Sequence, residues 1–230
     1  MRIVKSFRNL SGLERRMWFG SVLVLVLSFI LTKNQDYLTL TASLIGVTAL
    51  IFVSKGDVLG QVLTVVFSLF YAVISWRFRY FGEMITYLGM TAPIALLSVI
   101  TWLRNPYSEQ EVKVHHLKGR AWSVLWIFTV LVTSAFYFIL KAFHTPNLFF
   151  STVSIATSFL ASSLMMFRSP YYAIAYAAND IVLIILWILA AISDMVYLPM
   201  ILCFGIFLMN DLYGFVNWNR MERRQKGYRG

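Results

Sequence analysis

Long apolar segments, separated by short charged or turn-forming stretches, run through this chain of 230 residues and leave few folds open to it. Most approach the roughly 20 residues that a helix needs to cross a bilayer, and none alternates as a barrel strand does. Only 13% of the residues are charged, against about a quarter in soluble proteins. The sequence therefore predicts an all-α polytopic membrane protein with eight transmembrane helices. The predicted spans are residues 17–32, 38–54, 58–76, 84–103, 121–143, 148–167, 171–192 and 196–219.

Basic residues precede the first apolar segment, a pattern that also occurs in signal peptides. The segment ends near Lys33 without a small-residue cleavage site, so we expect a retained first helix. Ahead of it, Ile3, Phe7, Leu10 and Leu13 fall on one helical face between basic residues. This spacing suits either an interfacial amphipathic helix or a frayed basic tail.

Lysine and arginine are distributed unevenly over the predicted loops, and the net charge is +10. Sixteen of the 20 lie in the N-terminus, at Lys55, in the 104–120 loop, at Arg168 and in the C-terminus. Because cytoplasmic loops carry the excess of basic residues, both termini are predicted to be cytoplasmic. The charge then holds the chain against an anionic leaflet, and no nucleic-acid partner is expected. The four basic residues on the other side are Lys33, Arg77, Arg79 and Lys141.

The chain weakly repeats itself at an offset of 111 residues, which places Ser43 on Ser154 and Trp76 on Trp187. Four crossings separate the paired spans, so the two repeats enter the membrane in the same direction. Parallel repeats of this kind hold substrates near the midplane in some transporters. The alternative is that any eight-span chain can be cut into similar halves. The predicted units are 1–37 (basic N-terminus and extra helix), 38–103 (first three-helix repeat), 104–143 (loop and linker helix), 148–219 (second repeat) and 220–230 (basic tail).

Polar side chains occur near the middle of several predicted spans. Asn179 and Asp180 lie in one span, Asn210 and Asp211 in the next, and Thr91 lies in an earlier one. Intramembrane polar groups are costly and mark substrate or ion pathways. Because no lysine or arginine lies near these acids, each acid either stays protonated or faces a wet cavity, a cation or a cationic substrate.

Helical spacing puts several of these groups on shared faces. Tyr172, Tyr176, Asn179 and Trp187 follow one another at intervals of four, three and eight residues. Such a stripe offers aromatic planes beside an amide and would suit a flat, polar, ring-containing solute. Core packing or, for Tyr172, the interfacial belt is the alternative for the aromatics, and helix–helix contact is the alternative for the amides. The predicted substrate-binding residues are Gln61, Thr91, Tyr172, Tyr176, Asn179, Asp180, Trp187, Asn210 and Tyr213.

Motifs for other functions are missing from the sequence. There is no GxxxxGK[ST] loop, Cys203 is the only cysteine, and the three histidines all fall in predicted loops. We therefore expect no cofactor, no metal site and no enzymatic activity. One different function stays open, an intramembrane aspartyl hydrolase that uses Asp180 and Asp211 as a dyad. The Gly-x-Gly-Asp context expected for such an enzyme is missing.

Two short sequences stand out in the last two predicted spans. Tyr-Ala-Ala-Asn-Asp over residues 176–180 leads to Trp187, and Asn-Asp-Leu-Tyr-Gly over residues 210–214 is followed by Trp218. Together with the three-one-three arrangement, over about residues 38–220, they resemble the PnuC family of bacterial vitamin transporters. Within the proposed site, Asn179, Trp187, Asn210 and Tyr213 match positions of the family pattern.

The resemblance implies a SWEET-like bundle in the bacterial inner membrane, assembled as a homotrimer. It also implies facilitated diffusion of a vitamin-like nucleoside, nicotinamide riboside, which a cytosolic kinase then phosphorylates and traps. Trp187 stands alone where nicotinamide riboside carriers tend to pair tryptophans. Thiamine or riboflavin, which related branches carry, and a sugar therefore remain alternative substrates.

Overall fold

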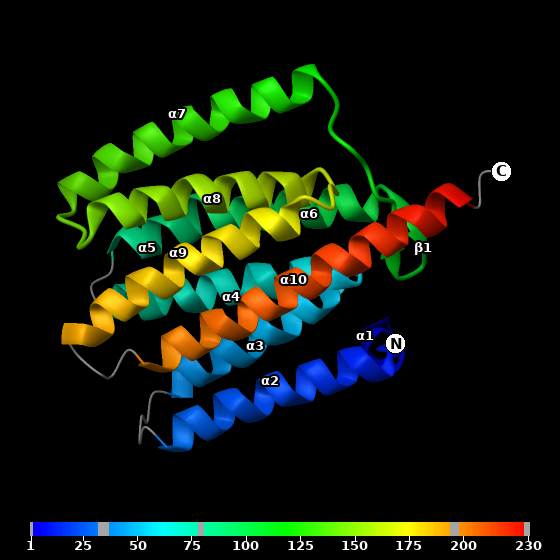
Figure 1. Ribbon diagram of the computed structural model, residues 1–230, viewed down its shortest axis with the longest axis horizontal. Helices are drawn as coiled ribbons and strands as arrows, with labels where there is room; N and C mark the ends of the chain where they lie inside the picture. The colour runs from blue at the N-terminus through cyan, green and yellow to red at the C-terminus, as the bar shows by residue number, and fades with distance from the viewer. Residues whose placement is uncertain (1, 32–36, 78–80, 194–197, 228–230) are drawn as a thin grey trace.

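Helices make up nearly all of the computed structural model, which describes residues 2–31, 37–77, 81–193 and 198–227. The long helices lie side by side as one bundle (Figure 1). This confirms the predicted all-helical class. The helices are α1 Arg2–Arg8, α2 Gly12–Leu31, α3 Tyr37–Ser54, α4 Val58–Arg77, α5 Phe81–Thr86, the π-helical turn η1 Tyr87–Thr91, α6 Ala92–Leu103, α7 Arg120–Ala142, α8 Leu148–Met166, α9 Tyr172–Ser193 and α10 Leu198–Gly227.

Within the described residues, seven helical stretches are long and apolar enough to cross a membrane, so the chain is a multi-pass membrane protein. They are α3, α4, the α5–η1–α6 stretch, and α7 to α10, with mean hydropathies between 1.5 and 2.1. The helix α2 is 20 residues long, but Glu14, Arg15 and Arg16 in its first turns reduce its apolar length. The eighth crossing therefore stays a prediction. Lys33 and Arg79, which enter the predicted charge asymmetry, lie outside the described residues.

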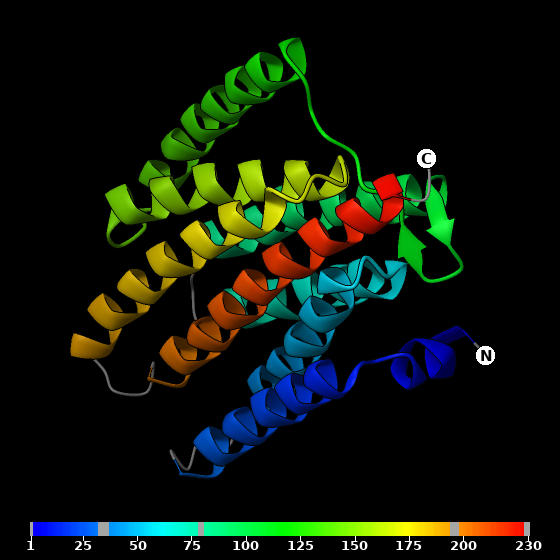
Figure 2. The same ribbon diagram turned by 45° about the vertical axis from the view of Figure 1, so that its right-hand side comes forward.

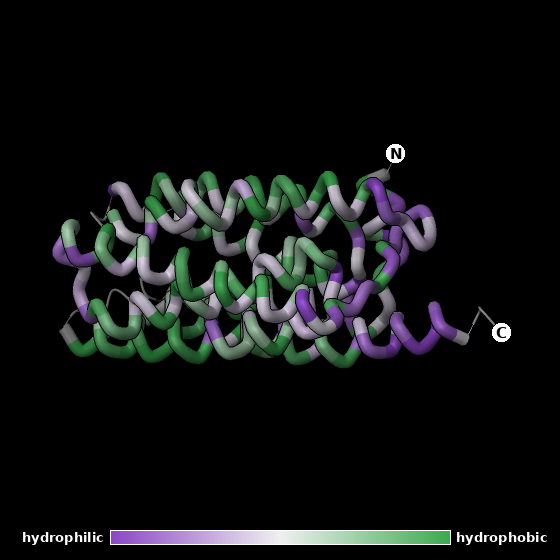
Figure 3. Tube along the Cα trace, turned by 90° about the horizontal axis from the view of Figure 1, so that it is seen from above, coloured by the Kyte–Doolittle hydropathy of each residue, from purple (hydrophilic) through white to green (hydrophobic). Residues whose placement is uncertain are grey.

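The bundle has a packed centre and two peripheral helices (Figures 1 and 2). The helices α3, α9 and α10 lie in its middle, while α2 and α7 lie on opposite sides. Apolar side chains of α7 point outward, and Phe138 is 68% and Val130 62% exposed. Both termini lie at the same end of the bundle, where the hydrophilic residues gather, and apolar residues dominate its length (Figure 3). This pattern suits a bundle surrounded by lipid.

The N-terminal segment forms a short helix rather than a frayed tail. Phe7 of α1 packs edge-on against Trp18 of α2 and Phe52 of α3, with ring centroids 5.7 and 4.9 Å apart. Leu10 is buried in the same cluster, whereas Ile3 is 59% exposed. The middle of the predicted apolar face thus docks on the bundle, whereas both of its ends are exposed, since Leu13 is 54% exposed.

Two equivalent-looking turns close the same end of the bundle, one between α3 and α4 and one between α8 and α9. Gly56 in the first and Arg168 in the second have left-handed backbones, with φ of 70° and 61°. A left-handed residue after a helix lets the next amide bond back to the last helical carbonyls. The matching bonds run from the Asp57 N–H to the Phe52 carbonyl (3.0 Å) and from the Ser169 N–H to the Leu164 carbonyl (2.9 Å).

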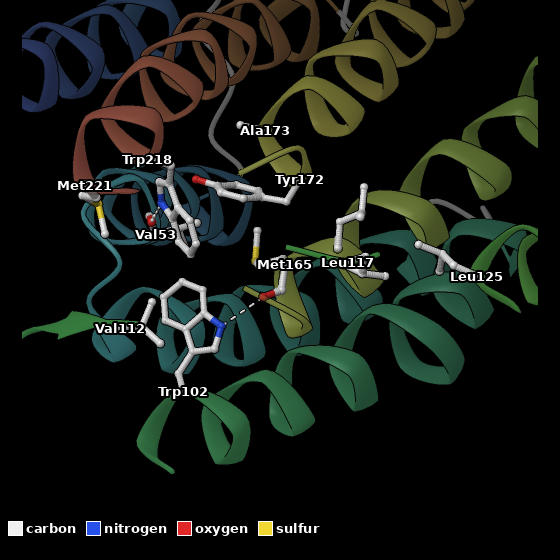
Figure 4. Close-up of a cluster of buried hydrophobic side chains, with 11 residues drawn as sticks. Val53, Trp102, Val112, Leu117, Leu125, Met165, Tyr172, Ala173, Trp218 and Met221 are labelled. Atoms are coloured by element: carbon white, nitrogen blue, oxygen red, sulfur yellow. Dashed lines mark hydrogen bonds between the residues drawn. The ribbon is translucent and has the colours of Figure 1, made fainter. Parts of the chain in front are cut away.

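A pair of buried tryptophans lies next to these turns (Figure 4). The Trp102 indole of α6 donates a hydrogen bond to the Met165 carbonyl near the end of α8, at 3.0 Å. The Trp218 indole of α10 donates to the Val53 carbonyl near the end of α3, also at 3.0 Å. The two rings pack against each other with centroids 5.5 Å apart. Each half of the chain thereby caps a helix of the other.

The loop between α6 and α7 contains a feature that the sequence did not predict, a hairpin of β1 (Pro106–Ser108) and β2 (Glu111–Val112). The Val112 N–H donates to the Gly56 carbonyl, and the His115 N–H donates to the Arg168 carbonyl, each at 3.0 Å. This loop therefore joins the two turns to each other.

Candidate functional site

Two acidic side chains meet where α9 packs on α10. Asp180 and Asp211 are each only 3% exposed, and their carboxyl groups lie close enough to interact with each other. Two like charges at one buried position repel each other, so the two carboxyl groups do not both ionise without a cation beside them. The pair thus carries at most one negative charge.

Tyrosine side chains surround this acid pair. Tyr176 of α9 lies close to both carboxyl groups, and its hydroxyl bonds to the Ser162 hydroxyl of α8 at 2.8 Å. Tyr172 lies one turn earlier, near Asp211, with its ring centroid 6.3 Å from that of Tyr176. Tyr87 approaches Asp180 from η1. The described residues thus combine carboxyl groups and aromatic rings from both halves of the chain.

The position of Tyr87 depends on a break in the helix between residues 81 and 103. Pro93 has no N–H to give to the ladder, and the preceding turn widens into a π-helix in which the Ala92 N–H bonds to the Tyr87 carbonyl. Thr91, a predicted site residue, ends this turn and is half-buried. The helix therefore accommodates Pro93 by a widened turn that re-aims the residues before it.

Four of the predicted site residues bury a polar atom that has no hydrogen-bond partner among the described residues. Three of these atoms are the acceptor oxygens of Gln61, Asp180 and Asn210, and the fourth is the Tyr172 hydroxyl. The side-chain nitrogens of the two amides, by contrast, do have partners. The Gln61 nitrogen contacts the Met165 sulfur, and the Asn210 nitrogen donates to the Ile206 carbonyl at 2.9 Å. Since buried polar groups are nearly always paired in folded proteins, these atoms suit a ligand that donates hydrogen bonds.

Asn179 is turned toward α8 rather than toward the acid pair. Its side-chain oxygen accepts hydrogen bonds from the hydroxyls of Thr157 at 2.8 Å, Ser158 at 3.0 Å and Ser154 at 3.4 Å. This oxygen therefore ties α8 to α9.

Trp187 and Tyr213 have contacts of their own. Trp187 packs against a second core cluster that includes Leu183 and Phe204. The Tyr213 hydroxyl donates to the Glu14 carboxylate of α2 at 3.0 Å. The structure thus brings together Tyr172, Tyr176 and Asp180, and it directs the Tyr213 hydroxyl toward α2.

Sequence reasoning missed Tyr87, Ser162 and the remaining hydroxyls of α8. A signal for the latter was present, because Ser151, Ser154, Ser158 and Ser162 recur at intervals of three and four residues and mark a polar face. No comparable signal pointed to Tyr87, since its direction depends on the π-helical turn. Among the described residues, no three His, Cys, Asp or Glu side chains group as metal ligands would.

Comparison with known proteins identifies the family. A sequence model described as Nicotinamide mononucleotide transporter matches residues 36–220, which is most of the chain. The chain belongs to this family. Members of the family are transporters, so the intramembrane site described above lies in a transport protein.

Two curated relatives are both named Nicotinamide riboside transporter PnuC. The one from Neisseria mucosa is 26% identical over 84% of this chain and 76% of its own length. The one from Haemophilus influenzae is 22% identical over 90% of each chain. A crystal structure described as the vitamin B3 transporter PnuC superposes with a TM-score of 0.81 at 23% identity, covering 94% of both chains. The fold is therefore similar to that of a PnuC transporter.

Proposed function

We propose that this protein carries nicotinamide riboside across the bacterial inner membrane by facilitated diffusion, and that a cytosolic kinase traps the product. The family and the names of the two relatives support transport of a nucleoside of this kind. The observation that carries the proposal is the set of buried, unpartnered oxygens of Gln61, Asp180 and Asn210. A carboxamide and ribose hydroxyls supply the donors that these oxygens lack.

The aromatic residues near the acid pair suit the other half of such a substrate. Tyr172, Tyr176 and Tyr87 lie within electrostatic range of Asp180 or Asp211, and aromatic rings attract a flat pyridinium. Thr91, Asn179, Trp187 and Tyr213 complete the proposed site. We assign them to the walls and supports of the proposed path, because Asn179 bonds to α8, Trp187 packs in a core cluster and Tyr213 bonds to Glu14.

The proposed architecture has eight membrane helices, with α2 as the extra crossing and α7 as the linker between two parallel three-helix repeats. The matched turns at Gly56 and Arg168 and the reciprocal bonds of Trp102 and Trp218 support the duplication. The basic end that holds both termini supports a cytoplasmic location for them.

We also infer a homotrimer within the bilayer. The outward apolar face of α7, which includes Val130 and Phe138, supports an assembly or lipid contact on that side of the bundle. The kinase is a functional partner in this proposal, and no contact with it is required.

Uptake of labelled nicotinamide riboside into proteoliposomes tests the proposal. Saturable exchange is expected without ATP or an ion gradient, and the double variant Asn179→Ala, Asn210→Ala should lose at least about tenfold in uptake because two buried polar contacts disappear. Asn219→Ala is the matched control, since the Asn219 side chain bonds only to the Phe215 carbonyl one turn before it. Normal uptake by the double variant would refute the proposed site.

The purified protein can also be used to test three alternative substrates. Thiamine, riboflavin and glucose are screened beside nicotinamide riboside for an increase in melting temperature, because a ligand that binds the folded state raises it.

The hydrolase alternative has one feature in its favour, since Asp180 and Asp211 are in contact. The missing Gly-x-Gly-Asp context and the transporter family favour transport instead. Cleavage of membrane peptides by the purified protein, abolished by Asp211→Asn, would support the hydrolase.

A further inference from the structure

No lysine or arginine of the described residues is found beside the acid pair of Asp180 and Asp211. Neither α8 nor α9 contains a lysine or arginine, and α10 contains none before Arg220. The other titratable groups that approach the pair are Tyr87 from η1, Tyr172 and Tyr176 from α9, and Cys203 from α10. None of these is a cation.

Burial of the two neighbouring carboxyl groups limits their total charge. Both are 3% exposed, and two like charges side by side at a buried site repel each other, so the pair carries at most a single negative charge. The outer oxygen of Asp180 is buried and has no partner among the described residues. A buried carboxylate oxygen of this kind is stable only beside a donor or a positive charge.

A second observation independent of the acids points to a ligand at the same place. Asn210 is 2% exposed and buries an unpartnered oxygen beside Asp211 in the sequence, and the Tyr172 hydroxyl is likewise unpartnered. Tyr172, Tyr176 and Tyr87 add aromatic rings within electrostatic range of the carboxyl groups. Carboxylate and aromatic faces together are the groups that proteins use to bind organic cations.

We propose that Asp180 and Asp211 act as one specificity-determining pair, whose single negative charge selects a flat organic cation over a neutral molecule of the same shape. This inference deepens the proposed function and rests on it only in taking the interior of the bundle as the transport path. Asp180 was expected at the site from the sequence, whereas the structure adds Asp211 as its necessary partner. The pair recognises the charge of the substrate rather than the identity of its ring.

The test compares two ligands that differ in charge and hardly in shape. Nicotinamide riboside carries a positive ring, and its reduced dihydro form is neutral. The full-length wild type should bind the cation at least about tenfold more tightly, because charge interactions are strong at a buried site. Affinities are measured as inhibition of labelled uptake and, separately, by thermal shift of the purified protein.

A double variant then assigns the preference to the pair. Asp180→Asn combined with Asp211→Asn keeps the size of both side chains but removes the shared charge, so the preference for the cation should fall to about twofold or less, with affinity for the neutral form retained. Either single variant leaves one carboxyl that can ionise and should keep most of the preference. Asp57→Asn is the matched control. Asp57 is also 3% exposed, but it lies in the turn after α3 and accepts a hydrogen bond from the Ser6 hydroxyl at 2.6 Å.

Each outcome decides between the two proposals. A wild type that binds the cation and the neutral form equally overturns the charge inference and leaves the proposed function standing. A wild type that ignores both but binds the cation thiamine, and not riboflavin or glucose, refutes the proposed substrate and supports the charge inference. Equal loss of both ligands in the variants overturns it, because a structural role would weaken both alike. If a variant fails to fold, the wild-type comparison still decides.

Discussion

The two three-helix halves, α3 to α6 and α8 to α10, share their frame and differ in their polar groups. Both close a turn with a left-handed residue, and both contribute a tryptophan that caps a helix of the other half. Ser68 occupies the position that corresponds to Asn179, and its hydroxyl bonds only to its own helix. Trp76 is 61% exposed, whereas its counterpart Trp187 is half-buried in a core cluster. Duplication thus explains the shared helical framework, whereas the polar groups of the candidate site lie where the two halves differ in sequence.

The third helix of each half differs in the same way. Residues 81–103 are interrupted by the π-helical turn η1, while α10 continues without a break for 30 residues. The interruption lets Tyr87 reach Asp180 on the other half. The acid pair therefore belongs to one half, but its surroundings need both.

The largest expected effect tests the equivalence of the two tryptophans. Trp102→Ala and Trp218→Ala should each lower the free energy of unfolding by about 3–5 kcal/mol, because each removes a buried indole and a hydrogen bond. Unfolding in detergent, followed by the loss of helical circular dichroism, measures the change. Trp76→Ala, at an exposed position, is the control and should cost little. A large loss for only one of the two buried tryptophans would show that the halves are not energetically equivalent.

A smaller effect is expected at the two turns, which use different residues for the same backbone. Gly56→Ala should destabilise the protein by about 1–2 kcal/mol, because a side chain is disfavoured in the left-handed region. Its Cβ would also lie 2.7 Å from the Met221 side chain and 3.3 Å from that of Val112. Arg168→Gly relieves the same strain and should be neutral or stabilising by up to about 1 kcal/mol. Opposite signs for the pair, measured by thermal unfolding, would sharpen the comparison, and equal destabilisation would contradict it.

The smallest effect concerns the polar contacts within each half. Thr157→Val removes the 2.8 Å bond to Asn179 and should cost about 0.6 kcal/mol, the average for hydrogen bonds between membrane helices. Ser68→Ala should change stability even less, since its bond stays within α4. Chemical unfolding of both variants measures the difference. If Ser68→Ala lowered the free energy of unfolding more than Thr157→Val, the stronger polar contacts between helices would belong to the first half rather than to the second.

Hydropathy predicted where helices lie in the sequence more reliably than where they end or turn. The predicted segment 58–76 corresponds to α4, Val58–Arg77, and 148–167 corresponds to α8, Leu148–Met166. The segment 196–219 was predicted as a membrane span only, and α10 continues beyond it through the charged tail to Gly227. Apolarity reports the extent of the membrane-embedded part, while backbone hydrogen bonding continues beyond it.

The site was harder to predict because it depends on side-chain direction. Asn179 and Asp180 are neighbours in the sequence, yet one faces α8 and the other faces α10. Successive residues of a helix point about 100° apart, so membrane depth alone cannot distinguish them. Tyr87 depends on a π-helical turn and Tyr213 on a contact with α2, and neither relation leaves a pattern in the sequence.

The loop between α6 and α7 also bears on how variable the chain can be. Its hydrogen bonds to the turns at Gly56 and Arg168 come from the backbone N–H groups of Val112 and His115. Almost any residue except proline supplies such a donor. These bonds therefore persist when the side chains change, whereas the Val112 side chain is held separately by its place in the core cluster. Relatives with unrelated loop sequences would then share the same tie, and a proline at either position would be the substitution that breaks it.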